Sequence, residues 1–149
     1  SIAILLYLAR KFKAPDHWYP SDLQKRAKVD EYLSWQHVTI RGKGSSLFIT
    51  KVLRPLLTGQ PVSPEKLKSV TEELNVVLKQ FEEKFLQDKP FIVGSEVSLA
   101  DLVALVELMQ PFSAGYDLFA ARPKLAAWRE RVEEALGKPL CQEAHEALL

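Results

Sequence analysis

Residues 97–102 read Val-Ser-Leu-Ala-Asp-Leu and carry the signature of a helix start. Ser98 is a favoured N-cap residue, and Asp101 follows three positions later, where its carboxylate can accept a hydrogen bond from the N-cap backbone. Val97 and Leu102 occupy the two positions of a hydrophobic staple, which fixes the direction of the chain as the helix begins. We therefore predict that Ser98 and Asp101 form a structural capping box and not a catalytic pair.

The helix that follows, from Leu99 to about Gln110, has apolar residues on every face. A helix of this kind must be covered by other elements on all sides, so we expect it at the centre of the fold. The segment before it has a single apolar stripe at helical spacing, which predicts an amphipathic helix packed against the core. The residues of this stripe are Leu67, Val70, Leu74, Val77, Leu78, Phe81 and Phe85.

The rest of the chain is also helical in its periodicity, and no segment alternates between apolar and polar residues as a strand would. Gly42 and Gly44 each cost about 1 kcal/mol in a helix interior, so we expect a kink or break near Gly42. We predict an all-α fold. Its other segments are a first helix at 1–9, a linker at 14–22, a helix from about Leu23 and an apolar run at 47–57. They continue with a turn at 58–64, irregular chain at 111–123, a helix carrying Leu125 to Leu136, and a short last helix ending at Leu149.

The 149 residues are 47% hydrophobic, which suffices for one domain with a buried core. Twenty Lys and Arg against 19 Asp and Glu give a net charge of +1, which argues against nucleic acid and against a membrane surface as partners. Cys141 is the single cysteine, so no internal disulfide is expected, and we interpret it as a packing residue. Because His17, His37 and His145 are too scattered to predict a zinc site, we expect a metal-free protein of a reducing, intracellular compartment.

The segment from Ser1 to Ala9 is almost wholly apolar, yet it differs from a targeting or membrane segment. No basic region precedes it, basic residues follow it, and a membrane span needs about 20 apolar residues. Because the chain starts without an initiator Met, we expect a piece cut inside or just before a buried helix. The Ser1 hydroxyl stands at the positive end of that helix, where it is either an ordinary N-cap or a site for a carboxylate or phosphate.

Several blocks of the chain resemble glutathione transferases. Residues 1–8 are similar to the helix that ends the thioredoxin-like domain of this family, and Val93-Gly94 followed by residues 98–102 resembles the capping box and staple of its C-terminal domain. Three further blocks resemble vertebrate theta-class members, at residues 30–37, 122–129 and 142–146. The blocks occur in the family's order and together cover essentially the whole chain.

The resemblance implies how the chain is divided. It predicts a glutathione transferase C-terminal helical bundle, preceded by one helix left over from a thioredoxin-like domain. Residues 1–13 would be that helix, residues 14–22 a linker, and residues 23–149 the C-terminal all-helical domain. Most of the thioredoxin-like domain, and the C-terminal extension that covers the theta-class active site, would then be missing.

The function implied by the resemblance is detoxification by conjugation. Theta-class members join the glutathione thiolate to small electrophiles such as alkyl halides, sulfate esters, epoxides and peroxides. Glutathione is the co-substrate and no cofactor is implied, while the full-length protein would be a cytoplasmic homodimer. The hydroxyl that helps to ionise the thiol lies upstream of this sequence, so we expect no catalytic residue in this chain and no conjugation by the chain alone.

The resemblance also implies the roles of particular residues. The Ser1 hydroxyl and backbone N–H would hold the γ-glutamyl carboxylate of glutathione, and the helix with Trp35, His37 and Arg41 would supply the electrophile pocket. Arg41 matches an arginine that a theta-class relative places against an anionic leaving group, although a solvated helix arginine is the alternative. Val38 stands where that relative has an aspartate that assists glutathione from the partner subunit, so this contact is not expected here.

Two other interpretations of the chain stay open at the level of sequence. The same helical fold serves as a non-catalytic interaction module in translation and synthetase-complex proteins, and such a module would bind a partner without affinity for glutathione. A truncated product with no activity is the other interpretation, and its apolar first helix would then make it prone to aggregation.

Overall fold

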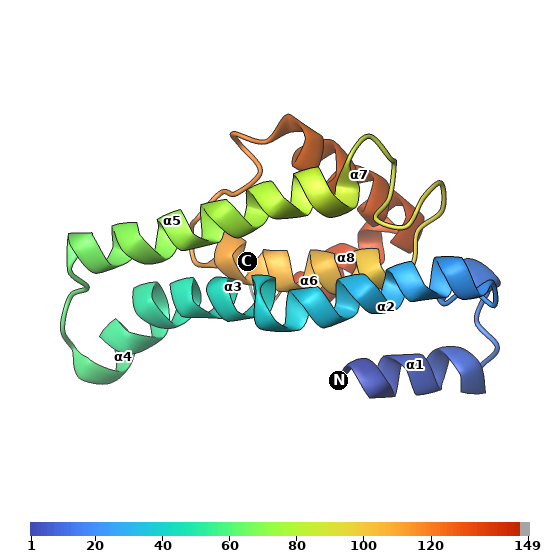
Figure 1. The fold of residues 1–149 in the computed structure, drawn as a ribbon. Coiled ribbons are helices and arrows are strands. Elements are labelled where there is room, and N and C mark those ends of the chain that lie inside the picture. The colour runs from blue at the N-terminus through green and yellow to red at the C-terminus, as the bar shows by residue number, and fades with distance from the viewer. Residues whose placement is uncertain (147–149) are drawn as a thin grey trace.

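The computed structural model describes residues 1–146, and all regular elements in this range are helices, as predicted (Figure 1). The helices are α1 (Ile2–Lys11), α2 (Leu23–Val38), α3 (Ile40–Phe48), α4 (Arg54–Thr58), α5 (Pro64–Gln80), α6 (Leu99–Ser113), α7 (Pro123–Leu136) and α8 (Lys138–His145). Short elements between them are the 3₁₀ turn η1 (Asp16–Trp18) and the π-helical turns η2 (Ile49–Leu53) and η3 (Phe81–Leu86). The predicted last helix ends at Leu149, outside the described residues.

α6 is the central helix, as its composition predicts. Nine of its residues are buried, and α2, α3 and α7 all pack against it. α3 also packs against α5, and α7 packs against α8. The predicted stripe on α5 and η3 is confirmed, because all its residues are buried except the half-buried Leu67.

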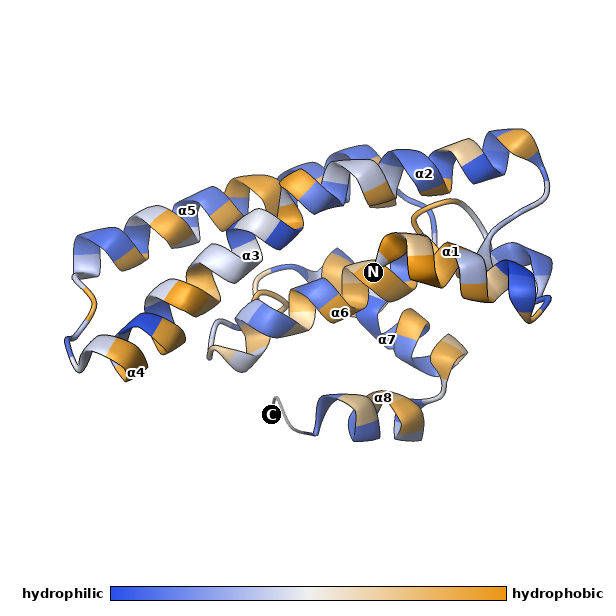
Figure 2. Ribbon diagram, turned by 90° about the horizontal axis from the view of Figure 1, so that it is seen from below, coloured by the Kyte–Doolittle hydropathy of each residue, from blue (hydrophilic) through white to orange (hydrophobic). Residues whose placement is uncertain are grey.

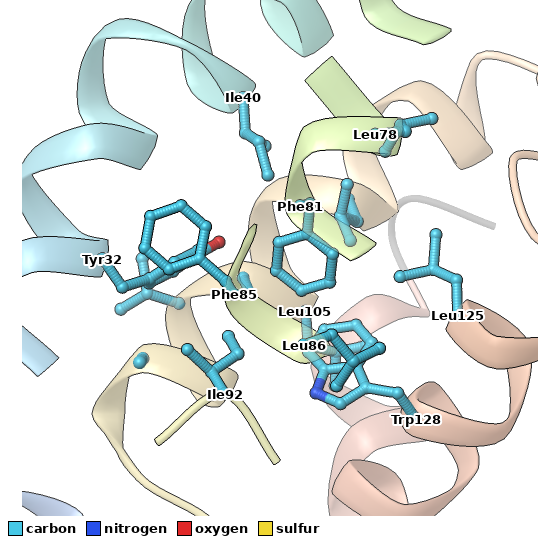
Figure 3. Packing of buried hydrophobic residues seen from close by; sticks show 14 of the residues in the cluster. Tyr32, Ile40, Leu78, Phe81, Phe85, Leu86, Ile92, Leu105, Leu125 and Trp128 are labelled. Carbon is cyan, nitrogen blue, oxygen red and sulfur yellow. The ribbon is translucent and has the colours of Figure 1, made fainter. Parts of the chain in front are cut away.

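Aromatic rings from three elements meet in the core (Figure 3). The Phe81 ring of η3 lies edge-on to Tyr32 of α2 at 5.8 Å between centroids, and edge-on to Trp128 of α7 at 5.2 Å. Such edge-to-face pairs contribute about 0.5–1.5 kcal/mol each beyond the burial of their surface. The C-terminal end of the α5 stripe therefore joins α2 to α7.

The predicted capping box is formed, and it is buried almost completely. The Ser98 hydroxyl accepts from the Ala100 N–H at 3.2 Å, and the Asp101 carboxylate accepts from the Ser98 N–H at 3.0 Å. Asp101 also accepts from the backbone N–H of Ile92 at 3.0 Å and from the Trp128 indole at 2.9 Å. One carboxylate thus fixes the start of α6, the loop before it and α7.

The predicted break near Gly42 is wrong in position. The long helix is interrupted at Thr39, where φ is −112° and ψ is −83°, and both glycines lie inside α3. The Thr39 hydroxyl donates to the Trp35 carbonyl at 2.5 Å, so a side chain competes for the backbone acceptor at this point. The cost of Gly44 is offset by close packing, because its Cα faces α6 and a Cβ here would lie 3.5 Å from Pro111 Cδ.

The predicted irregular segment at 111–123 is found, but it begins later than predicted, at Ala114. α6 continues through Pro111 and ends at Ser113. Proline in a helix removes one backbone hydrogen bond and usually ends or bends the helix. Here the Pro111 ring is buried beside Gly44 of α3, so packing keeps the last turn helical.

α1 is covered on one side within the described chain. Ile2, Leu5, Leu6 and Ala9 pack against the core cluster, whereas Ile4, Tyr7 and Phe12 are 57–71% exposed. Figure 1 shows α1 at the edge of the bundle beside α2, and Figure 2 shows that its ribbon is mainly hydrophobic. The sequence predicts cover on more than one side, and the second side has none in residues 1–146.

The linker between α1 and α2 is held at several points. The Tyr19 ring lies between two guanidinium groups, 5.1 Å from Arg10 and 4.8 Å from Arg26, and its hydroxyl donates to the Asp30 carboxylate at 3.1 Å. The His17 ring nitrogen Nδ1 lies 2.7 Å from the Val97 carbonyl. These contacts fix α1 relative to α2.

The capping box generates a prediction about stability. Replacing Asp101 with Ala should lower the free energy of unfolding by about 3 kcal/mol or more, because the indole N–H of Trp128 and two backbone N–H groups lose their acceptor in the core. Ser98→Ala removes one capping bond and should cost only about 1 kcal/mol. Urea unfolding followed by circular dichroism measures both values. Equal costs for the two variants would contradict the central role of the carboxylate.

The packing at Gly44 generates a second prediction. Gly44→Ala should raise the free energy of unfolding by up to about 1 kcal/mol, because the helix gains propensity and the new methyl group makes an ordinary contact with Pro111. Gly44→Leu should lower it by about 1–3 kcal/mol by forcing α3 from α6. Gly42→Ala, where no atom lies within 4 Å, is the matched control and should give a similar gain. Thermal unfolding measures these changes. If Gly44→Leu unfolded at the same temperature as the unmodified chain, the close contact between α3 and α6 would be disproved.

Candidate functional site

A cleft of about 500 Å³ lies between the start of α1 and the face of α2 and α3. It brings together Ser1, predicted to bind glutathione, with His37 and Arg41, predicted for the electrophile pocket. The lining residues from α1 are Ser1, Ile2, Ala3 and Leu6, and those from α2 and α3 are Asp30, Leu33, Ser34, His37 and Arg41.

Ser1 occupies the N-cap position of α1 but does not cap it with its side chain. Its carbonyl accepts from the Leu5 N–H at 3.1 Å, which is the first bond of the helix. The N–H groups of the first turn have no partner inside a helix, and they form the positive end of its dipole. The start of α1 therefore offers hydrogen-bond donors and a partial positive charge to the cleft.

His37 and Arg41 lie one turn apart and are both exposed at the other wall of the cleft. Within residues 1–146, no ion pair joins Arg41 to a carboxylate. The acidic residue of the cleft is Asp30, whose carboxylate accepts from Tyr19 of the linker. Because Arg41 is not neutralised by direct contact, this end of the cleft suits an anionic group.

Trp35 does not line the cleft, although it was predicted with His37 and Arg41 for the electrophile pocket. Its ring packs on Phe85 at 4.6 Å and on Tyr32 at 6.0 Å, so it belongs to the edge of the core. Val38 is also absent from the lining, and 73% of its surface is exposed.

Three residues that line the cleft from α2 were not predicted as site residues from the sequence. Asp30, Leu33 and Ser34 precede His37 at spacings of three and four residues, so these four share one face of α2, and Arg41 continues the wall on α3. This periodicity is present in the sequence, but the wall contains more polar than apolar side chains. A search for apolar stripes therefore overlooks it.

Cys141 lies in a second, smaller hollow of about 210 Å³ between α7 and α8. The thiol is 8% exposed, and burial together with the nearby charge of Glu133 raises its pKa. The closest histidine, His145, places Nδ1 2.8 Å from the carbonyl of Cys141 and is not bonded to the sulfur. These observations support the interpretation of Cys141 as a packing residue.

The described part of the chain offers neither a cluster of metal ligands nor a membrane span. Residues 1–146 contain no group of three or more His, Cys, Asp or Glu side chains placed to hold a metal ion. None of the helices in this range is long and apolar enough to cross a bilayer.

Residues 46–135 match the family described as Glutathione S-transferase, C-terminal domain. The chain is 63% identical to glutathione S-transferase theta-1 of Gallus gallus over 147 residues, which are 99% of this chain and 56% of the relative. It superposes on the apo form of human glutathione S-transferase T1-1 with a TM-score of 0.96 at 56% identity, covering 99% of this chain and 62% of the other.

A second solved structure contains a bound molecule. It is a human theta-class glutathione transferase in complex with the glutathione conjugate of 1-menaphthyl sulfate, with a TM-score of 0.92, 53% identity, and coverage of 99% of this chain and 60% of that one. The chain spans about three-fifths of the length of the curated relatives that it matches.

The environment of Cys141 generates a prediction. At mildly alkaline pH the thiol should react with iodoacetamide about tenfold or more slowly than free cysteine, because it is buried and its pKa is raised. In denaturing urea the two rates should become equal. Mass spectrometry of the alkylated chain over time measures the rates, and fast reaction of the folded chain would show an accessible thiolate instead.

Proposed function

This chain belongs to the glutathione S-transferase family, and from that premise we propose that it is the C-terminal part of a theta-class glutathione transferase. The full-length protein joins the glutathione thiolate to small electrophiles such as alkyl halides, sulfate esters, epoxides or peroxides. The observation that carries this proposal is the cleft, in which the start of α1 faces His37 and Arg41. The transferase names of the relatives support an enzyme over an interaction module.

The proposed division of the chain follows the same comparison. Residues 1–13 are the last helix of a thioredoxin-like domain, residues 14–22 are the linker, and residues 23–149 are the C-terminal helical domain. Two observations support this division. The outer face of α1 is apolar and exposed, as expected of a helix that packs against further chain, and the relatives are longer than this chain. The full-length protein is a cytoplasmic homodimer in this proposal.

In the proposed mechanism, α1 binds glutathione. The γ-glutamyl carboxylate of glutathione accepts hydrogen bonds from the Ser1 hydroxyl and from the backbone N–H groups at the start of the helix, where the dipole favours an anion. The carboxylate is then held at one end of the cleft. The thiol lies toward the rest of the proposed thioredoxin-like domain, which supplies the hydroxyl that helps to ionise it.

The electrophile is bound against α2 and α3. The thiolate attacks carbon, the carbon–sulfur bond forms, and the bond to a halide or sulfate breaks as the leaving group departs with its electron pair. Arg41 stabilises the negative charge that develops on this group, and His37 offers a second hydrogen bond. In this proposal the group that activates the thiol belongs to the thioredoxin-like domain, so we expect no conjugation by residues 1–146 alone.

The full-length protein tests this proposal. With glutathione and a small alkyl halide, it should form conjugate faster than the uncatalysed reaction. Arg41→Gln should lower kcat/KM for a sulfate ester about tenfold or more, because the leaving group loses a cationic partner. Arg54→Gln removes an equal charge on α4, outside the cleft, and should leave kcat/KM unchanged. A rate no higher than the uncatalysed reaction would exclude the transferase.

A further inference from the structure

Helix α6 runs in the same direction as α2 and α3 and packs along them (Figure 1). Two contacts fix the register of α3 on α6. A Cβ at Gly44 would lie 3.8 Å from the Glu107 carbonyl, and the Ser45 hydroxyl donates to the Gln110 side chain at 3.0 Å. The backbone of Glu107 is therefore level with Gly44.

The register places the Glu107 side chain beside two residues of the cleft. Side chains on a helix point back toward its N-terminus, so the Glu107 carboxylate is directed from the level of Gly44 toward the preceding turn of the parallel helix. Arg41 lies three residues before Gly44, and His37 lies one turn earlier on the same face. The carboxylate therefore lies near the guanidinium of Arg41 and the imidazole of His37.

The environment of Glu107 agrees with this placement. Glu107 is half-buried, and burial raises the pKa of its carboxyl while the charges of Arg41 and His37 oppose the rise. The other titratable neighbour is Tyr32 of α2, whose own pKa is raised by burial first and then by the carboxylates of Asp101 and Glu107. In residues 1–146, the side chains whose charges act on the Glu107 carboxyl are Arg41 of α3 and His37 of α2.

Glu107 attracts Arg41 without forming a direct ion pair with its guanidinium. No ion pair connects them within the described residues, and Glu107 is not among the residues that line the cleft. A direct ion pair would have to break before Arg41 could bind an anion. A carboxylate at longer range leaves the hydrogen-bond donors of the guanidinium free while still limiting where the group moves.

We propose that Glu107 is a positioning residue of the cleft, the counter-charge on α6 that holds Arg41 and His37 at the wall facing the start of α1. The significance of this role for leaving-group binding rests on the proposed function, whereas the electrostatic link itself does not. Glu107 touches no reacting atom and acts only through these two residues.

The first experiment measures the mobility of the Arg41 side chain in this chain by NMR relaxation of its Nε–H group. Glu107→Gln keeps the shape of the side chain and removes its charge, so Arg41 should become more mobile as its guanidinium loses an attracting carboxylate. Arg54 in the same spectra serves as an internal reference and should not change. Glu130→Gln makes the same change of charge on an exposed position of α7 and is the matched control.

The second experiment approaches the same link from the exposed side, where a substitution does not endanger folding. Arg41→Gln should raise the pKa of the Glu107 carboxyl, because a favourable positive charge is lost, and Arg54→Gln should leave it unchanged. Carbon-detected NMR titration of the glutamate carboxyl groups measures both. Mobility of Arg41 that is unaffected by Glu107→Gln, or a Glu107 pKa that is unaffected by Arg41→Gln, would overturn the proposal.

Titration of the unmodified chain with sodium sulfate separates this proposal from the proposed function. Shifts at the Ser1, His37 and Arg41 signals are expected if the cleft binds an anionic group. Their absence would count against the proposed function and against the role of Glu107 in leaving-group binding, whereas the electrostatic link is decided by the Arg41 mobility and the Glu107 pKa alone.

Discussion

Asp101 accepts hydrogen bonds from the backbone of Ile92, the backbone of Ser98 and the indole of Trp128, so one carboxylate joins the loop before α6, the start of α6 and α7. A carboxylate is costly in a core unless donors surround it, and burial does raise the pKa of this one against the opposing effect of its hydrogen bonds. Because Asp101 fixes the direction in which α6 begins, the positions of the helices that pack along α6 also depend on Asp101. The cleft wall on α2 and α3 is among them.

The packing of α3 against α6 determines where the cleft wall lies relative to α6. Gly44 allows α3 to approach Pro111 closely, and the interruption at Thr39 lets the chain leave the axis of α2 just before that approach. Arg41 lies between these two features, so its position is set by one local competition for a hydrogen bond and one tertiary contact. Neither feature touches the cleft, yet both determine which way its wall faces.

The parts of the fold that sequence predicts are those specified by neighbours in the chain. The capping box at Ser98 and the stripe on α5 follow from spacing alone, and the structure has both. The interruption at Thr39 depends on a side-chain hydrogen bond, and the continuation of α6 through Pro111 depends on packing against α3. Local helix propensity predicts neither feature. For the cleft, the resemblance to a family indicated Ser1, His37 and Arg41, whereas Glu107 comes from α6 and becomes visible only when the register of the helices is known.

The linker, although rich in proline, holds α1 and α2 at a fixed separation. Tyr19 is clamped between Arg10 of α1 and Arg26 of α2, and its hydroxyl reaches Asp30 in the cleft. Tyr19 thus connects the α1 wall to the α2 wall at the end of the cleft opposite to Ser1. In the proposed reaction the two reactants are held on separate walls and gain rate only while they stay aligned, so the Tyr19 ring would set the width of the gap without touching either reactant.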